Sequence, residues 1–253
     1  MGPDSRILLQ PCFILHQRPY RDTSVILDLF SRDFGRVSAV ARGARAERSR
    51  LRGVLQAFTP LFISWLGRSD LLTLVHAEIA SPPLYFSGVR IFSGLYLNEL
   101  VLRLLPKGDP FSEIFDSYRL ALVELTLPDV SEASLLRRFE LDLLRALGYE
   151  LVLTHDVSGN AVEPTLDYQY VPEQGLIPAT GMRQKGALYV SGQALSRFDD
   201  GDVNHANVLN EIRALTRLAL SGLLGGEPLQ SRELVIAFHA AKREVESRPG
   251  SDN

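Results

Sequence analysis

The periodicity of the hydrophobic residues changes at Ser81-Pro82-Pro83, and this change constrains the fold more than any other feature of the chain. Before it, runs rich in β-branched and aromatic residues alternate with turn-forming residues, which is typical of strands. After it, apolar residues recur at the spacing of a helix. The apolar positions that first show this spacing are Ile91, Leu95, Leu102 and Leu105. The sequence therefore predicts an α+β protein, with a strand-rich domain over 1–80 and an α-helical domain over 81–240.

Five strands are expected in the first domain, with a hairpin through Gly35 and a short helical stretch over 51–57. The expected strands span residues 7–16, 24–31, 36–41, 61–66 and 71–79. A helix between the third and fourth of five strands is the chain order of an OB-fold, a small β-barrel that often binds oligonucleotides. We therefore predict a five-stranded OB-fold barrel.

The second domain contains several helix signals and one segment without periodicity. Asp109-Pro110 and Asp129, the latter with Glu132 three residues on, are typical helix starts. Two later helices are expected over 206–224 and 231–240, the last capped by Ser231. Residues 154–182 carry Gly, Pro and Asn and predict an irregular insertion, while the charged segment 241–253 predicts a disordered tail.

Composition excludes several classes of protein. The chain is 45% hydrophobic over 253 residues and has a single cysteine, Cys12, so it has no internal disulfide framework. We find no basic segment followed by an apolar core at the start and no apolar run of membrane-spanning length. These features predict a soluble cytoplasmic protein that does not enter a membrane.

Positive charge is concentrated between Arg32 and Arg52. Seven arginines and only two acidic residues lie there, in a chain whose net charge is −3. Such segregation favours a surface for a polyanion, although a solvated arginine-rich loop has the same composition. Guanidinium groups pair with phosphates and stack on bases. The residues expected to contact nucleic acid are Arg36, Arg42, Arg45, Arg48, Arg50 and Arg52. Tyr20, Phe34 and Trp65 could stack on bases, or the last two could pack inside the barrel.

A second candidate site lies on the helix that follows Asp129. Arg137 and Arg138 adjoin an apolar face that includes Leu136 and Leu143. An apolar pocket with an arginine rim suits a short peptide that ends in a hydrophobic residue and a carboxylate. Packing within a helical bundle explains the same leucines equally well.

Catalytic and cofactor motifs are lacking. The sequence contains neither a phosphate-binding glycine-rich loop nor a nucleophile elbow nor a zinc-protease motif, so we expect no enzyme activity and no cofactor. His76, within a strand, is expected to be a hydrogen-bonded structural residue. His155-Asp156 has no thiolate nearby to complete a zinc site.

One acidic cluster matches part of a calcium-binding loop. Asp200, Asp202, Asn204 and Glu211 fall at positions 1, 3, 5 and 12 of an EF-hand, but His205 replaces the turn glycine. We therefore expect Asn204 or Asp202 to cap the helix that begins near 206, with Glu211 on its solvent face, and no metal.

Six segments together resemble the bacterial RecO family. They begin at Phe13, Gly35, Leu51, Ser93, Leu135 and Gly225, and read FILHQRPYRDTSVILDLF, GRVSAVARGAR, LRGVLQAFTPL, SGLYLNEL, LLRRFELDLLRALGY and GGEPLQSREL. The resemblance covers about residues 7–240 in the family order and is specific as a set.

The resemblance implies a DNA repair and recombination mediator that binds single- and double-stranded DNA without catalysis. Such proteins anneal complementary strands coated by single-stranded DNA-binding protein (SSB). They assist RecA loading with RecR and, in many bacteria, RecF, which implies association with the nucleoid. The acidic, phenylalanine-ending SSB tail would map to the helix of Arg137. Some members carry a four-cysteine zinc module after the LGY segment, but residues 151–160 here contain no cysteine, so zinc is not expected. Two alternatives from other classes are a protein-interaction adaptor whose barrel binds a partner rather than DNA, and a DNA-processing enzyme.

Overall fold

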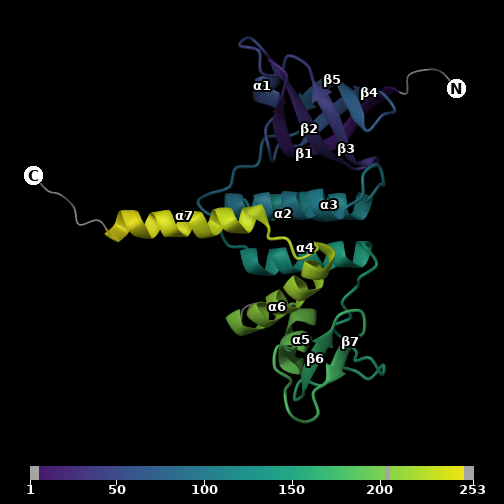
Figure 1. The fold of residues 1–253 in the computed structure, drawn as a ribbon, viewed down its shortest axis with the longest axis vertical. Helices are drawn as coiled ribbons and strands as arrows, with labels where there is room; N and C mark the ends of the chain where they lie inside the picture. The colour runs from purple at the N-terminus through teal and green to yellow at the C-terminus, as the bar shows by residue number, and fades with distance from the viewer. Residues whose placement is uncertain (1–5, 203–204, 248–253) are drawn as a thin grey trace, which may run out of the picture. The chain divides into compact units, whose positions relative to one another are not determined.

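The strands of the amino-terminal part close into a barrel (Figure 1). The computed structural model describes residues 6–202 and 205–247. Neighbouring strands follow the order β1-β2-β3-β5-β4 around the barrel, and only the β3–β5 contact is parallel among these pairs. The elements are β1 (Arg6–Tyr20), β2 (Ser24–Ser31), β3 (Gly35–Ala41), α1 (Leu51–Val54), β4 (Leu61–Leu66) and β5 (Leu71–Ile79). Since α1 lies between β3 and β4, the predicted OB-fold is confirmed.

Strand β2 is buried on both faces, which explains why its sequence is apolar almost throughout. Leu27 and Leu29 point into the barrel core. Phe30, on the other face, packs against Phe115 and Tyr118, with ring centroids 5.3 and 5.8 Å away. Both aromatic partners belong to α3 (Ser112–Glu124), which follows α2 (Arg90–Leu104). The barrel therefore continues directly into a layer of helices.

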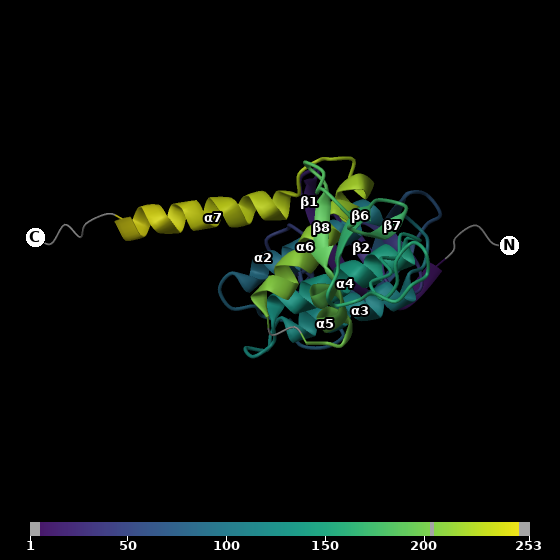
Figure 2. The same ribbon diagram turned by 90° about the horizontal axis from the view of Figure 1, so that it is seen from below.

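Contacts divide the chain into two compact units. Unit 1 comprises residues 1–128 and 228–253, and unit 2 comprises residues 129–227. This division differs from the one drawn at residue 80 from periodicity, because α2 and α3 pack with the barrel and the last helix returns to α2. Figures 1 and 2 show that last helix, α7 (Gln230–Ser247), as a single long helix in yellow. Its residues 241–247 are helical, so the expected disordered tail is wrong there; residues 248–253 lie outside the described chain.

Helix α2 binds the start of α7 and the two points at which the chain leaves and re-enters unit 1, Pro128 and Pro228. The Glu99 carboxylate accepts hydrogen bonds from the backbone nitrogens of Gln230 and Ser231, each at 2.8 Å, and so caps α7. The Arg90 guanidinium donates to the carbonyl of Pro128, and that of Arg103 donates to the carbonyl of Pro228, each at 2.9 Å. Phe92 and Phe238 pack 5.2 Å apart between their ring centroids.

Unit 2 combines helices with a small sheet. Its elements are α4 (Glu132–Ala146), β6 (Asp167–Val171), β7 (Gly175–Pro178), β8 (Leu188–Ser191), α5 (Gly192–Asp199) and α6 (Ala206–Leu223). The strands pair antiparallel in the order β7-β6-β8. The predicted irregular insertion over 154–182 is therefore wrong in part, since β6 and β7 lie within it. Tyr168 and Leu176 of these strands join the core formed with α5 and α6.

The helix starts differ in detail from the predicted ones. Helix α3 begins at Ser112, three residues after Asp109, and Ser131 rather than Asp129 caps α4 by accepting from the Ser134 nitrogen. Among the described residues, α6 has His205 at its N-cap position and no side-chain hydrogen bond caps the helix, so the prediction that Asp202 is the cap is wrong. Asn204 lies outside the described residues.

The prediction that Glu211 lies on the solvent face of α6 is wrong. Its carboxylate accepts hydrogen bonds from the Ser191 nitrogen at 2.6 Å and from the Ser191 hydroxyl at 3.1 Å. Ser191 in turn caps α5 by accepting from the Ala194 nitrogen. Glu211 therefore holds the start of α5 and is committed to that contact.

Within the described chain, no helix is long and apolar enough to span a membrane.

Candidate nucleic-acid interface

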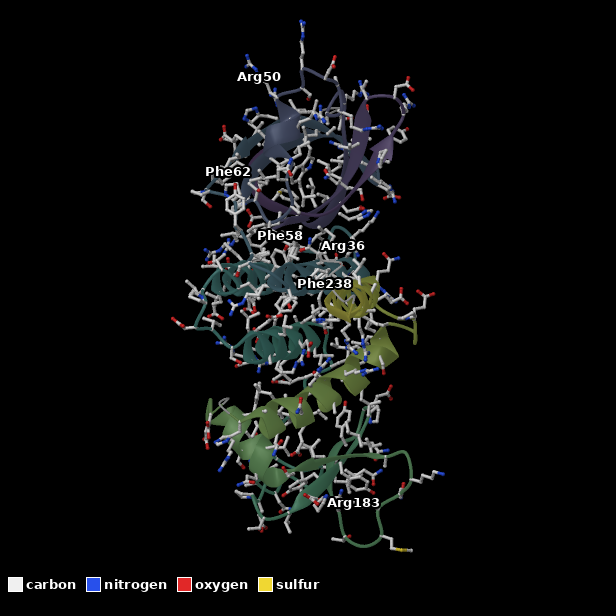
Figure 3. All side chains as sticks on the ribbon, turned by 90° about the vertical axis from the view of Figure 1, so that its left-hand side faces the viewer. Arg36, Arg50, Phe58, Phe62, Arg183 and Phe238 are labelled. Atoms are coloured by element: carbon white, nitrogen blue, oxygen red, sulfur yellow. The ribbon has the colours of Figure 1, made fainter. Side chains whose placement is uncertain are left out.

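Strand β3 divides the arginine run into two groups. Arg32 lies in the turn before the strand and Arg36 at its start, and the other five arginines follow its last residue, Ala41. At roughly 3.3 Å per residue, the seven residues of β3 separate the groups by about 20 Å. Figure 3 shows the separation, with Arg50 at the end of the barrel farther from the helices and Arg36 beside them. The run is therefore not one continuous surface.

The two arginines of the β2–β3 hairpin, Arg32 and Arg36, are bound within unit 1. The Arg32 guanidinium pairs with the Asp116 carboxylate at 3.1 Å. The Arg36 guanidinium donates to the carbonyl of Leu105 at 2.5 Å, and burial lowers the pKa of Arg36. These contacts join the β2–β3 hairpin to α2 and α3. Arg36, expected to contact DNA, thus lies apart from the other five arginines of that set.

The remaining arginines lie on an anchored loop. Gly43 adopts a left-handed φ of 67°, and Ala44 is buried in the barrel core. The Arg45 nitrogen donates to the carbonyl of Thr23 at 2.7 Å, which fixes the loop to the β1–β2 turn. The backbone is therefore held while the arginine side chains are exposed. The exposed arginines of this loop and of α1 are Arg42, Arg45, Arg48, Arg50 and Arg52.

Two further arginines, which the sequence analysis missed, come from the β1–β2 hairpin. Arg18 and Arg21 are exposed, and the Arg21 guanidinium lies 5.1 Å from the ring centroid of Tyr20. The signal was present in the turn sequence QRPYRD, where arginines flank the aromatic residue. The turn meets the loop because Val25 pairs with Ala41 across β2 and β3. We call the combined surface the arginine end; it consists of Arg18, Arg21, Arg42, Arg45, Arg48, Arg50 and Arg52.

A cavity of about 500 Å³ opens at the arginine end. It lies between the β1–β2 hairpin, the loop after β3 and α1. Arg18, Arg45 and Arg52 line it together with apolar residues from the end of the barrel core. Three positive charges therefore border one concave surface.

Trp65 and Phe34 pack in the barrel. Trp65 is 3% exposed, and its ring meets that of Phe34 edge to face with centroids 5.4 Å apart. Phe34 is partly buried against the same core. Of the three aromatic residues considered for base stacking, only Tyr20 lies beside the arginine end, where its ring contacts Arg21.

At the second candidate site, on α4, one of the two arginines predicted to form the rim of a pocket is buried. The side chain of Arg137 is 7% exposed and forms an ion pair with Glu140, itself buried. The other carboxylate oxygen of Glu140 accepts from the Thr216 hydroxyl of α6 at 2.5 Å. Leu143 is fully buried, and Leu136 is partly buried. Glu140 therefore holds α4 to α6 while Arg137 neutralises its charge, as in the packing alternative, and only Arg138 of the two arginines is exposed.

The histidines considered for chemistry form local hydrogen bonds. His76 Nε2 lies 3.2 Å from Glu78 Oε2 on the barrel surface, and His155 Nδ1 lies 2.9 Å from the Thr154 hydroxyl. The Asn160 amide donates to Asp156 and lowers the pKa of that carboxyl. Over residues 6–202 and 205–247, we find no group of three His, Cys, Asp or Glu side chains that could hold a metal ion.

Comparison with known proteins matches both parts of the chain. The model of the family "Recombination protein O N terminal" matches residues 6–83, and that of "Recombination protein O C terminal" matches residues 86–233. The protein named DNA repair protein RecO from Aliivibrio fischeri (strain MJ11) is 40% identical over 229 residues, which cover 90% of this chain and 95% of the relative. The protein of the same name from Aromatoleum aromaticum is 43% identical over 236 residues, covering 93% and 98%. These matches span the barrel and the helical region alike, so the chain belongs to the RecO family.

Proposed function

We propose that this protein acts in DNA repair and homologous recombination by binding single- and double-stranded DNA through the arginine end, without catalysing a reaction. The observation that carries the proposal is the collection of seven exposed arginines from two segments at one end of an OB-fold barrel, in a chain of net charge −3. The relatives named DNA repair protein RecO support the biological role.

We also propose that the protein anneals complementary strands coated by SSB and assists RecA loading together with RecR and, in many bacteria, RecF. Arginines grip phosphates regardless of base sequence, and a mediator that pairs strands of any sequence needs such contacts. Contact with the SSB tail is assigned to the exposed part of α4 around Arg138 and Leu136. Arg137 and Leu143, both buried, would support this surface from beneath.

The salt dependence of DNA binding tests the proposed surface. In the test variant, alanine replaces Arg42, Arg45, Arg48, Arg50 and Arg52. Each arginine that grips a phosphate of a single strand contributes about 0.7 to the slope of log affinity against log salt, so the slope should fall by up to about 3.5 when all five are replaced. Fluorescence anisotropy of a labelled oligonucleotide over a salt series measures the slope. An Arg213→Ala/Arg217→Ala variant, which removes exposed arginines of α6, should keep the wild-type slope. A folded five-arginine variant with that same slope would refute the DNA role of this loop.

Annealing of SSB-coated strands separates the mediator from the adaptor. The mediator should accelerate annealing of coated strands and lose this effect when SSB lacks its tail, whereas an adaptor that does not bind DNA should not anneal strands at all. Arg138→Ala should weaken binding of an acidic, phenylalanine-terminated peptide in a variant that remains folded. Magnesium-dependent DNA cleavage abolished by a point substitution would favour the enzyme alternative.

A further inference from the structure

The cavity at the arginine end has an apolar floor. Val25, Ala44 and Leu55 line it and are each less than a tenth exposed, and half-buried Leu51 adds a side wall from α1. All four belong to the barrel core or pack against it. The floor is therefore the end of a packed hydrophobic core, which exposes carbon atoms that a flat apolar group could cover.

The rim of the same cavity is polar and positive. Arg18, Arg45 and Arg52 approach it from three segments, and the amide side chains of Gln17 and Gln56 lie among them. Gln56 Nε2 donates to the carbonyl of Arg52 at 2.5 Å, which ties that amide to α1. Amides can both donate and accept hydrogen bonds, as the edge of a nucleobase requires.

We propose that this cavity binds one unpaired nucleobase of a single strand. This inference rests on the proposed function, because the rim arginines and their neighbours Arg42, Arg48 and Arg50 would hold the flanking phosphates. A volume of about 500 Å³ lies within the range of small-molecule sites. The base would lie on the apolar floor, and the amides would meet its edge. The positive surface continues beyond the cavity, which suits a polyanionic strand better than a single small ligand.

A base in a duplex cannot enter the cavity unless it leaves its partner and its stack. The duplex would therefore contact only the arginines, whereas a single strand would contact the arginines and the floor. Base contact is independent of counterion release, so it should raise affinity by the same factor at every salt concentration. Single- and double-stranded DNA would thus be distinguished by a contribution that salt does not remove.

The test compares two oligonucleotides of equal length on the wild-type protein, a thymidine strand and an abasic strand with the same phosphates. The thymidine strand should bind roughly fivefold to tenfold more tightly at each salt concentration, which is near the lower end of the contribution of aromatic stacking per base. The slope of log affinity against log salt should be equal for the two strands. Ala44→Leu fills the floor and keeps every arginine, so it should bring the ratio close to one. Ala46→Leu adds the same side chain in the same loop outside the cavity and should preserve the ratio.

Each outcome decides the proposal. Equal affinity of the wild-type protein for both strands, with a steep salt dependence, would overturn the base site and leave the arginine end as a phosphate surface. An unchanged ratio in folded Ala44→Leu would also overturn it. Weak binding of both strands without salt dependence would overturn the proposed function itself. The comparison on the wild-type protein needs no variant, so misfolding of Ala44→Leu leaves the test decisive.

Discussion

The buried ion pair of α4, whose Glu140 also accepts a hydrogen bond from Thr216 of α6, makes a quantitative prediction about unit 2. Replacing Glu140 with leucine leaves the guanidinium of Arg137, only 7% exposed, without its carboxylate, and leaves the Thr216 hydroxyl only the carbonyl of Arg213, at 3.4 Å, as acceptor. Removing one partner of a buried pair costs about 3–5 kcal/mol, since the remaining charge stays desolvated. The Nε of Arg137 is already buried without a hydrogen-bond partner among the described residues, so it offers no compensation.

The matched control is the double variant Arg137→Met/Glu140→Leu, which removes both charges. Replacing a buried pair with apolar residues of similar volume is often neutral or stabilising. Thr216→Val removes only the hydroxyl, and we expect it to cost about 1.5–3 kcal/mol because the hydrogen bond it loses has a charged acceptor. The expected order of stability is therefore wild type and double variant first, then Thr216→Val, then Glu140→Leu.

Urea unfolding measures these differences with two probes. Trp65 is the only tryptophan and lies in unit 1, so its fluorescence reports that unit, while far-ultraviolet circular dichroism also reports α4 and α6 of unit 2. With a urea dependence of about 2 kcal/mol per molar, Glu140→Leu should lower the midpoint of the unit 2 transition by about 2 M. The Trp65 midpoint should not move. If Glu140→Leu proved as stable as the double variant, the argument from an uncompensated buried charge would be refuted.

Three other predictions concern unit 1. Gly35→Ala should destabilise unit 1 far more than Gly43→Ala, as measured by Trp65 fluorescence in urea. Both glycines adopt a left-handed φ, which costs alanine roughly 1–2 kcal/mol. Only at Gly35 would the new Cβ also lie 1.8 Å from a backbone atom, the carbonyl oxygen of Asp109. Equal midpoints would contradict this. Burial raises the pKa of the Cys12 thiol to about 12, so the native protein should resist alkylation at pH 8. Because this pKa is higher in the folded protein than in the unfolded chain, stability should fall as the pH rises from about 9 towards 12. Rapid labelling under native conditions would contradict that burial. Arg36→Ala should cost about 1.5 kcal/mol and leave the salt slope of DNA binding unchanged; a smaller slope would place Arg36 on DNA.

The barrel could be predicted from the sequence because its signals are local. Strand β2 matched its predicted range, Ser24–Ser31, since turn residues bound it closely on both sides. Strands β6 to β8 gave no such signal, because they are only four or five residues long and lie among glycines and prolines. Their stability comes from packing on α5 and α6, which periodicity within a short window cannot reveal.

The candidate site was predictable in composition but only partly in position. Counting charges identified the arginine run but treated it as one surface, although the strand predicted over 36–41 already separates Arg36 from Arg42. It also could not join Arg21, which lies in another turn, to the same surface. The surroundings of Arg137 were likewise not predictable from the local sequence. A helical pattern places an arginine beside leucines, whereas the Thr216 hydroxyl that completes its buried network lies 76 residues away from Glu140 in the sequence.

The return of α7 to α2 has a consequence for synthesis on the ribosome. Unit 1 is interrupted in sequence, because its last helix is translated only after all of residues 129–227. Until Gln230 and Ser231 have left the exit tunnel, the Glu99 carboxylate has no helix start to cap and the ring of Phe92 lacks Phe238. Unit 1 is therefore begun first but completed last, and a nascent chain stalled after residue 227 would expose the α2 surface that α7 covers.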